Sequence, residues 1–283
     1  MIVNLSRHWP HALLKLKRIR LSILTVIMKI ISTAKQNSRM KKRLVLLPGW
    51  AMHSEMWGPF AQQLASHYTL TCVAQLPAEA TLEAMGERIL HSLDDEPFYL
   101  LGWSLGASVA LHLAARYPSR VEGVILMASN PCFLANEQWP GMDAATFHAF
   151  CAQIAQNAPV TLQRFLALQC QGIEKNREVL ETVKARFALT DGPSLTALME
   201  GLALLEKRDM REALAGMTCP VAAILSCDDA LIPAAVGEAM KRLQPALQLH
   251  FIEQAGHLPF IVQPQACVNL LCDFIDATRK SEN

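Results

Sequence analysis

The stretch Gly102-Trp103-Ser104-Leu105-Gly106 decides how this chain is interpreted. It follows the apolar run Phe98 to Leu101, which is typical of a buried strand, and it precedes Ala107 to Tyr117, whose periodicity indicates a helix. A serine between two glycines at such a turn sits on a tight, strained backbone, where a Cβ on either flank would strike the neighbouring strand or helix. The pattern therefore predicts that the hydroxyl of Ser104 is held above the edge of a sheet as a nucleophile.

A blander interpretation of the same stretch is available. A five-residue pattern with three fixed positions also arises by chance, and Ser104 would then be an ordinary helix N-cap. The two interpretations differ in what they require elsewhere in the chain. A serine hydroxyl is a poor nucleophile unless a histidine takes its proton, and a carboxylate must fix the tautomer of that histidine.

Both partners are present downstream, in the order acid and then histidine. Asp228 and Asp229 follow the predicted strand Val221 to Leu225, and His257 follows the predicted strand Leu247 to Ile252. We favour Asp229 as the acid because it begins the pattern Asp-x-Leu-Ile-Pro, which has the spacing typical of an acid loop. Asp228 is expected to be solvated or hydrogen-bonded to the turn backbone. The predicted catalytic residues are thus Ser104, Asp229 and His257.

An acyl-transfer site also needs two N–H donors for the oxyanion of the tetrahedral intermediate. One donor is expected from Leu105, directly after the serine, and the other from Trp50, in the loop after the first strand. The side chains of Trp50 and Trp103 are candidate apolar walls of the substrate pocket, and the alternative for each is simple core packing.

Apolar runs and helical stretches alternate along the rest of the chain, which predicts an α/β fold with a mostly parallel central sheet and helices on both faces. The predicted strands are Leu44 to Leu47, Thr69 to Ala74, Phe98 to Leu101, Val124 to Ala128, Val221 to Leu225 and Leu247 to Ile252. The predicted helices are Ala61 to Ser66, Leu82 to Leu93, Ala107 to Tyr117, Ala234 to Leu243 and Gln265 to Arg279. No convincing strand lies between 137 and 216, which we interpret as an inserted helical cap. The core is then 40–136 with 217–283.

The composition narrows the class of protein. Apolar residues make up 52% of the 283 residues and charged residues 18%, and the formal net charge of +1 gives no indication of a nucleic-acid partner. Eight cysteines show no C-x-x-C pair and no finger-like histidine spacing, so a zinc site is unsupported. The simplest expectation is a reduced, cytoplasmic protein.

Residues 1–39 differ in character from the rest. Eleven Lys or Arg and no acidic residue lie between Arg7 and Arg43, and the apolar run Leu21 to Ile31 is too short to span a bilayer. This part could be a signal-peptide core or an amphipathic helix on a membrane surface. We favour an upstream start or a dispensable extension, because the sequence from Met40 onward is a natural beginning for the first strand of a cytoplasmic enzyme.

Several motifs together resemble one known family. They are Gly49-Trp50, Gly102-Trp103-Ser104-Leu105-Gly106, Ala128-Ser129-Asn130-Pro131-Cys132-Phe133, Trp139-Pro140-Gly141, Arg164-Phe165-Leu166-Ala167-Leu168-Gln169, and Gly256-His257 with Pro259-Phe260. From about Lys42 to the C-terminal helix, the chain is similar to the pimeloyl-acyl-carrier-protein methyl ester esterases of biotin synthesis, which have the α/β-hydrolase fold. The serine motif 102–106 and the three predicted catalytic residues are shared by many hydrolases, whereas the cap segments Trp139-Pro140-Gly141 and Arg164 to Gln169 are more particular.

The resemblance implies hydrolysis of the methyl ester of a pimeloyl chain carried on acyl carrier protein. It implies no metal and no cofactor, and it adds Phe165 to Trp50 and Trp103 as substrate-binding candidates. It also implies that basic cap residues, Arg164 and Arg177, contact the acidic carrier protein, although a solvated helix face is the alternative for such charges. We expect a monomer with no stable membrane span.

The chain departs from the family pattern in three places. Pro48 replaces the histidine usual before the glycine of the oxyanion loop, and the loop Gln75 to Ala80 is short and lacks glycine. Ala107 stands where a third glycine is common. None of these changes removes a predicted catalytic group, so they put the substrate in question more than the chemistry. A general short-chain carboxylesterase and a non-catalytic ligand-binding protein on a hydrolase fold remain the alternatives.

Overall fold

Six short strands form one parallel sheet in the order β2-β1-β3-β4-β5-β6. The computed structural model describes residues 41–281, so the predicted extension 1–39 lies outside the described residues. The strands are β1 (Arg43–Leu47), β2 (Thr69–Cys72), β3 (Phe98–Trp103), β4 (Val121–Met127), β5 (Val221–Ser226) and β6 (Gln248–Ile252). All six predicted strands are present, which confirms the predicted α/β fold.

Burial explains why the central strands read as continuous apolar runs. Every residue of β3 and of β5 is buried, because helices cover both faces of the sheet. The edge strands β2 and β6 are only partly buried and carry polar residues, as in Thr69 and Gln248. The position of a strand in the sheet therefore sets how apolar its sequence is.

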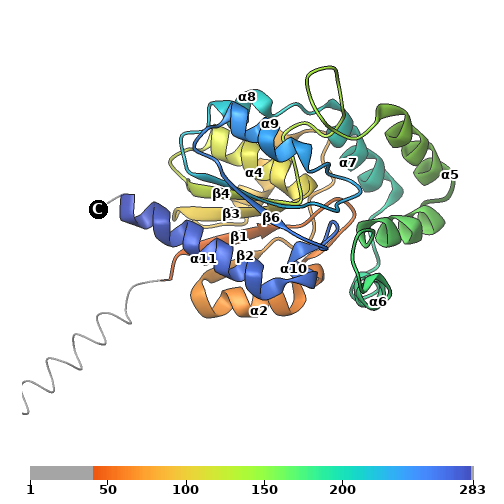
Figure 1. Ribbon diagram of the computed structural model, residues 1–283, viewed down its shortest axis with the longest axis horizontal. Helices are drawn as coiled ribbons and strands as arrows, with labels where there is room; N and C mark the ends of the chain where they lie inside the picture. Colours follow the sequence, from red (N-terminus) through yellow and green to blue (C-terminus); the bar gives the residue numbers. More distant parts are fainter. Residues whose placement is uncertain (1–40, 282–283) are drawn as a thin grey trace, which may run out of the picture. The chain divides into compact units, whose positions relative to one another are not determined.

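The helices lie in two layers (Figure 1). On one face are α4 (Leu105–Arg116), α8 (Arg211–Ala215) and α9 (Ala235–Leu243), and on the other are α2 (Gly58–His67) and α11 (Pro264–Ser281). The helix α3 (Leu82–His91) packs against α4. Two single-turn helices, η1 (Ser54–Trp57) and α10 (Pro259–Val262), were not predicted, because four residues are too few to show a helical period.

The direction in which successive strands are added to the sheet changes once, after β2. The chain passes from β1 outward to the edge strand β2, and then returns to place β3 on the opposite side of β1. The loops that follow β1 and β3 consequently diverge and leave a crevice at the carboxyl ends of these strands. The serine turn follows β3, so the fold places it at this crevice.

Four helices lie between β4 and β5: α5 (Ala144–Gln169), α6 (Asn176–Phe187), α7 (Leu195–Lys207) and α8. Helix α5 is interrupted at Asn157, which has non-helical backbone angles, two residues before Pro159. The first three helices extend beyond the carboxyl ends of the strands in Figure 1. We call the part 137–216 the inter-strand helical segment.

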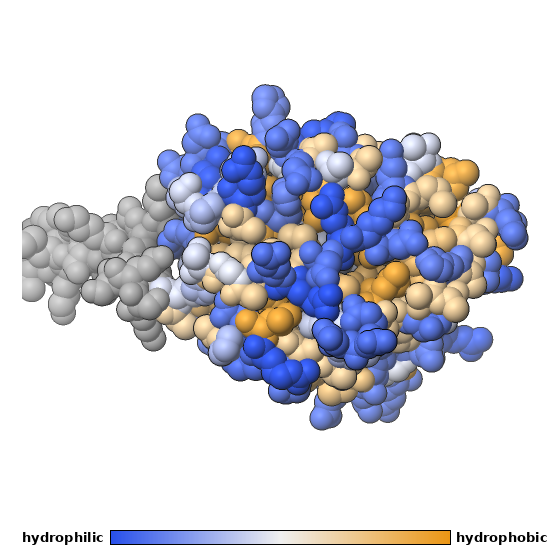
Figure 2. Space-filling view, turned by 90° about the horizontal axis from the view of Figure 1, so that it is seen from above, coloured by the Kyte–Doolittle hydropathy of each residue, from blue (hydrophilic) through white to orange (hydrophobic). Residues whose placement is uncertain are grey.

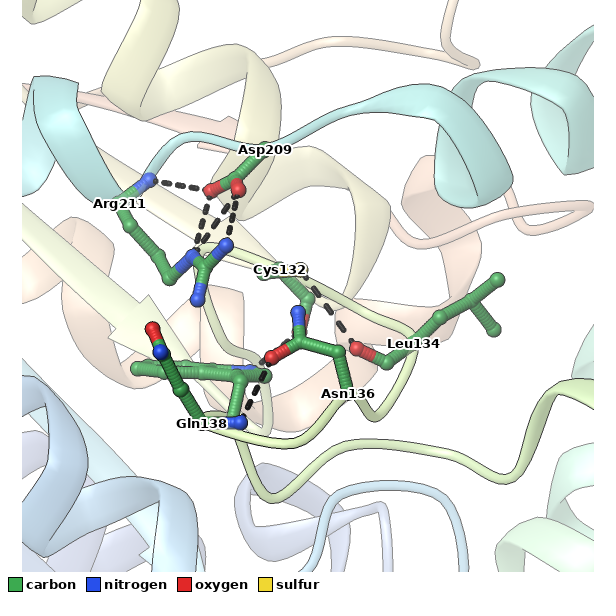
Figure 3. Close-up of polar contacts among 7 residues, drawn as sticks. Cys132, Leu134, Asn136, Gln138, Asp209 and Arg211 are labelled. Carbon is green, nitrogen blue, oxygen red and sulfur yellow. Dashed lines mark hydrogen bonds and ion pairs between the residues drawn. The ribbon is translucent and has the colours of Figure 1, made fainter.

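The two ends of this segment are tied to each other. The backbone N–H of Met210 donates to the carbonyl of Pro131 at 2.7 Å. Figure 3 shows Asp209 and Arg211 beside the loop 132–138, with the Arg211 Nε 2.9 Å from the Asp209 Oδ1. The hydrogen bond from Arg211 holds the pKa of the Asp209 carboxyl below its usual value. The loop that leads from β4 into the helical segment is thus hydrogen-bonded to the chain that leads from the segment back to β5.

Candidate active site

Ser104 occupies a strained turn between β3 and α4. Its backbone angles are φ 53° and ψ −121°, a conformation that residues with a Cβ rarely adopt. The two flanking glycines explain how the turn closes. A Cβ on Gly102 would lie 2.4 Å from the Cα of Ala107, and one on Gly106 would lie 2.3 Å from the carbonyl oxygen of Leu47. Only glycine fits at either place.

The side chain of Ser104 does not cap α4. Ser104 does stand at the N-cap position of α4, but its side chain makes no capping hydrogen bond. Its backbone is fixed by other groups, since its N–H donates to the carbonyl of Met127 at 3.0 Å and its carbonyl accepts from the Ser129 hydroxyl at 2.8 Å. The Ser104 hydroxyl is therefore not used to cap the helix.

Asp229 and His257 form a buried pair. Asp229 Oδ2 lies 2.7 Å from His257 Nδ1, and each side chain is only 1% exposed. The other carboxylate oxygen of Asp229 accepts from the backbone N–H groups of Leu231 and Ile232, at 2.8 and 3.2 Å. The carboxylate is thereby fixed from both sides, and its contact with Nδ1 leaves Nε2 as the nitrogen that can exchange a proton with a substrate or nucleophile.

Asp228 has a different role in the structure. Its Oδ2 accepts a hydrogen bond from the backbone N–H of Gln254 at 2.9 Å, in the turn that leads to His257. Gln254 and Gly256 both have positive φ angles there. Asp228 thus contacts the backbone of the histidine loop, whereas Asp229 contacts the imidazole itself.

Two further groups hold the backbone of His257. Its N–H donates to the carbonyl of Gln169 at 3.0 Å, and its carbonyl accepts from the indole N–H of Trp103 at 3.0 Å. The imidazole Nε2 is buried and has no hydrogen-bond partner among the described residues. Sequence reasoning gave Gln169 and Ser129 no role in the site, although both stand in motifs that carry the family resemblance, because a motif does not show that the Gln169 carbonyl contacts His257 or that the Ser129 hydroxyl contacts Ser104.

The loop after β1 reaches the serine turn. A Cβ on Gly49 would lie 3.3 Å from the Cβ of Ser104, so this loop passes directly beside the candidate nucleophile. The indole N–H of Trp50 donates to the carbonyl of Leu198 in α7 at 2.9 Å, and its ring meets Phe165 edge-on at 5.0 Å between centroids. Trp50 therefore joins the predicted oxyanion loop to the inter-strand helical segment.

An apolar cavity of about 110 Å³ opens at Ser104. Its lining comes from the loop after β1, the loops after β4 and β5, and helices α5 and α7. The residues are Trp50, Ser104, Phe133, Met142, Thr146, Phe147, Phe150, Phe165, Leu168, Leu202, Leu205 and Leu231. The wall is almost wholly apolar and contains no charged residue, so it suits an alkyl chain.

The candidate substrate-binding residues are distributed unequally around this cavity. Trp50 and Phe165 line it. Trp103 lies outside its lining and packs against Trp57 and Phe260, with its ring 5.9 Å from that of His257. The loop that departs from the family pattern, 75–80, lies next to Trp50 in a separate small cleft and does not line the apolar cavity. Pro48 is buried.

The surface of the molecule carries the candidate carrier-protein contacts. Arg164, in α5, and Arg177, in α6, are both exposed. Among residues 41–281, the exposed large hydrophobic residues are Val160, Leu189, Leu195 and Phe251, and the first three belong to the inter-strand helical segment. Figure 2 shows hydrophilic and hydrophobic residues interspersed over one face, including the end that carries this segment.

Burial keeps three of the cysteines as thiols. Burial raises the pKa of the Cys170 and Cys219 thiols to about 11 and that of Cys267 to about 12, so these thiols stay protonated near neutral pH. Within residues 41–281, no group of three or more His, Cys, Asp or Glu side chains could hold a metal ion. No helix in that range is long and apolar enough to cross a membrane.

Comparison with known proteins adds independent evidence. Residues 44–270 match the sequence pattern of the alpha/beta hydrolase family. The chain belongs to that family. The pimeloyl-[acyl-carrier protein] methyl ester esterase of Klebsiella pneumoniae (strain 342) is 35% identical over 81% of this chain and 91% of its own length. The protein of the same name from Methylococcus capsulatus is 33% identical over 82% of this chain and 94% of its own. These relatives confirm the resemblance predicted from the sequence.

Solved structures agree on the fold. A bromoperoxidase from Bacillus anthracis has a TM-score of 0.76 at 20% identity, over 84% of this chain and 92% of its own. An esterase from Exiguobacterium antarcticum has a TM-score of 0.73 at 21% identity, over the same shares. Because these two neighbours are named for different activities, the fold alone does not fix the reaction.

Proposed function

We propose that this chain is a serine carboxylesterase whose catalytic residues are Ser104, Asp229 and His257. The observation that carries the proposal is the buried contact of 2.7 Å between Asp229 and His257, at the sheet edge where Ser104 stands in its strained turn. A carboxylate that orients an imidazole is the arrangement that activates a serine hydroxyl for acyl transfer, and the Ser104 hydroxyl is not engaged in capping α4.

The proposed reaction uses these groups in two halves. His257 Nε2 takes the proton of Ser104 as the serine oxygen attacks the ester carbonyl, and the backbone N–H groups of Trp50 and Leu105 stabilise the oxyanion. His257 then gives its proton to the departing alkoxide, which leaves as the alcohol. Water hydrolyses the acyl-enzyme through the same imidazole. Asp229 stabilises the imidazolium in both halves and keeps its own charge.

The proposed substrate is the methyl ester of pimeloyl-acyl carrier protein, and methanol is the alcohol released. The names of the curated relatives support this choice. The apolar cavity supports it as well, since a chain of methylenes gains about 0.8 kcal/mol for each CH₂ group that it buries. We assign Trp50 and Phe165 to the wall that contacts the chain. Trp103, behind His257, is assigned to hold the backbone of the histidine, and its direct contact with substrate stays a prediction.

The proposal includes docking of acyl carrier protein on the helical segment 137–216, which then acts as a cap. Arg164 is exposed on α5 and Arg177 is exposed on α6. In sequence they lie on either side of the end of α5, where the carbonyl of Gln169 accepts from the N–H of His257. Exposed positive charge speeds association with an acidic partner and fixes its orientation. The exposed Val160, one helical turn before Arg164, offers an apolar contact beside that charge.

We also propose that the enzyme works in the cytoplasm as a monomer. All eight cysteines are free thiols, including the buried Cys170 and Cys267, as in proteins that fold under reducing conditions. Light scattering of the purified chain tests the monomer, and fractionation of the native host tests the location. A stable dimer or an exported protein would overturn the corresponding part.

Genetic complementation tests the substrate. The full chain, a version that begins at Met40 and the full chain with Ser104→Ala are expressed in a biotin auxotroph that lacks its methyl ester esterase. The first two should restore growth without biotin and the third should not. Failure of a soluble chain that still cleaves p-nitrophenyl butyrate would overturn the pimeloyl substrate and favour a general carboxylesterase.

A further inference from the structure

A second, smaller recess meets the active site at Ser104. It has a volume of about 10 Å³ and lies on the side of Ser104 where β4 ends and α4 begins. Phe133 and Leu205 line both this recess and the apolar cavity, so these two side chains separate the two spaces. Ser104 lines both spaces as well, so a group in the recess is next to the candidate nucleophile.

The recess differs from the apolar cavity in chemistry. Besides Ser104, four polar or charged residues line it: Ser108, Ser129, Asn130 and Arg208. Asn130 is only 4% exposed, and its Nδ2 has no hydrogen-bond partner among the described residues. Leaving a buried amide donor unsatisfied costs roughly 1–3 kcal/mol. Such a group in the wall of a small recess indicates that the recess receives a hydrogen-bond acceptor.

The size of the recess suits one water molecule. A space of about 10–15 Å³ on this measure is the least that holds a water, and the recess is about that size. Asn130 Nδ2 can donate to the oxygen of that water, and the Ser129 hydroxyl, which donates to the Ser104 carbonyl, keeps lone pairs that can accept from it. Ser108, in the first turn of α4, adds a third polar contact.

We infer that this recess positions the water that hydrolyses the acyl-enzyme, with Asn130 as its positioning residue. The inference rests on the proposed function, because it requires an acyl group on Ser104. An acyl chain in the apolar cavity displaces water from the rest of the site, so the second half of the reaction needs a polar place of its own for water.

The step balances with groups already present. The water oxygen forms a bond to the acyl carbonyl carbon while one water proton passes to His257 Nε2. The tetrahedral intermediate then breaks its bond to the Ser104 oxygen, which takes that proton back from His257. The products are a free carboxylic acid and the restored serine, with no change of oxidation state.

The test separates formation of the acyl-enzyme from its hydrolysis. With p-nitrophenyl butyrate, a stopped-flow burst of p-nitrophenolate reports acylation, and the steady rate reports hydrolysis when that step is slow. Asn130→Ala should leave the acylation rate within about threefold of wild type and slow hydrolysis at least about tenfold, because only the second step uses the water. A butyryl group should then accumulate on the peptide that contains Ser104.

Three comparisons make the result specific to water. Asn130→Ser, which keeps a donor, should restore part of the hydrolysis rate. Asn269→Ala, the same substitution on an exposed position of α11, should change neither step. In added methanol, Asn130→Ala should raise the ratio of methyl butyrate to butyrate among the products, because attack by methanol does not depend on the water that Asn130 positions. Ser108→Ala gives a second test of the recess if Asn130→Ala does not fold.

The outcomes distinguish this inference from the proposed function. If Ser104 is acylated in the wild type but the Asn130 and Ser108 variants hydrolyse the acyl-enzyme at the wild-type rate, or lose both steps equally, the recess does not position the water. If no acyl group forms on Ser104 in the wild type, the proposed catalytic residues are wrong.

Discussion

The carboxyl edge of the sheet and the inter-strand helical segment contribute to the active site in different ways. At the sheet edge, backbone geometry fixes each reacting group, through the positive φ of Ser104 and the two N–H donors on Asp229. In the helical segment, side chains such as Phe150 and Phe165 contribute only apolar surface to the cavity. Under the proposed function, the edge supplies the reacting groups and the segment supplies most of the wall that contacts the substrate. Substitutions in the two regions should therefore affect different kinetic constants.

The adjacent carboxylates Asp228 and Asp229 provide the largest expected contrast. Asp229→Asn should lower kcat by about 10³–10⁴-fold, because an amide cannot stabilise the imidazolium and favours the wrong tautomer of His257. Asp228→Asn should lower kcat by less than about tenfold, since its contact is with the Gln254 backbone. Steady-state hydrolysis of p-nitrophenyl butyrate measures both. Equal losses would contradict the assignment of Asp229 as the acid.

Two glycines test whether the edge is fixed by its backbone. Gly102→Ala should destabilise the protein by about 3 kcal/mol or more, because its Cβ would lie 2.4 Å from a backbone atom of Ala107. Gly216→Ala is the matched control, since its nearest neighbour would lie 3.5 Å away and its φ is −86°. Urea unfolding followed by circular dichroism measures the difference. An unfolding midpoint of Gly102→Ala that equals that of the control would show that the turn can relax.

Phe165 tests the apolar wall of the helical segment. Phe165→Ala removes a ring that meets Trp50 and Phe150, so KM for a long-chain ester should rise about tenfold while kcat changes little. The same substitution should raise KM less for an acetate ester, which does not fill the cavity. A loss confined to kcat would instead place Phe165 in the chemistry of the sheet edge.

Charge reversal of the proposed carrier contacts is expected to have the smallest effect. Arg164→Glu with Arg177→Glu should lower kcat/KM for a carrier-bound methyl ester by about fivefold at low salt, and added salt should reduce the difference. Hydrolysis of p-nitrophenyl butyrate should not change, because both residues are exposed away from the cavity lining. Unchanged kinetics with the carrier substrate would remove these residues from the docking surface.

The sequence predicted the sheet well, because buried parallel strands have strong local patterns, and the structure brings Asp229 and His257 together after the two strands from which they were expected. It did not predict which faces of α5 and α7 line the cavity, since helical periodicity does not say what an apolar face meets. Trp50 and Trp103 illustrate the same limit. Each directly follows a glycine near the end of a strand, yet only Trp50 lines the cavity. The direction of a side chain depends on packing, which the sequence does not show. Asn130 and Gln169 both stand in motifs that carry the family resemblance, but a motif does not show what the Asn130 amide or the Gln169 carbonyl faces in the folded chain.

The most direct test of the account measures methanol released from the methyl ester of pimeloyl-acyl carrier protein. Wild-type protein should release one methanol for each ester cleaved, leaving the carrier thioester intact, and Ser104→Ala should lower the rate by about 10³-fold or more. Release of methanol by the alanine variant at near the wild-type rate would contradict the assignment of Ser104 as the nucleophile.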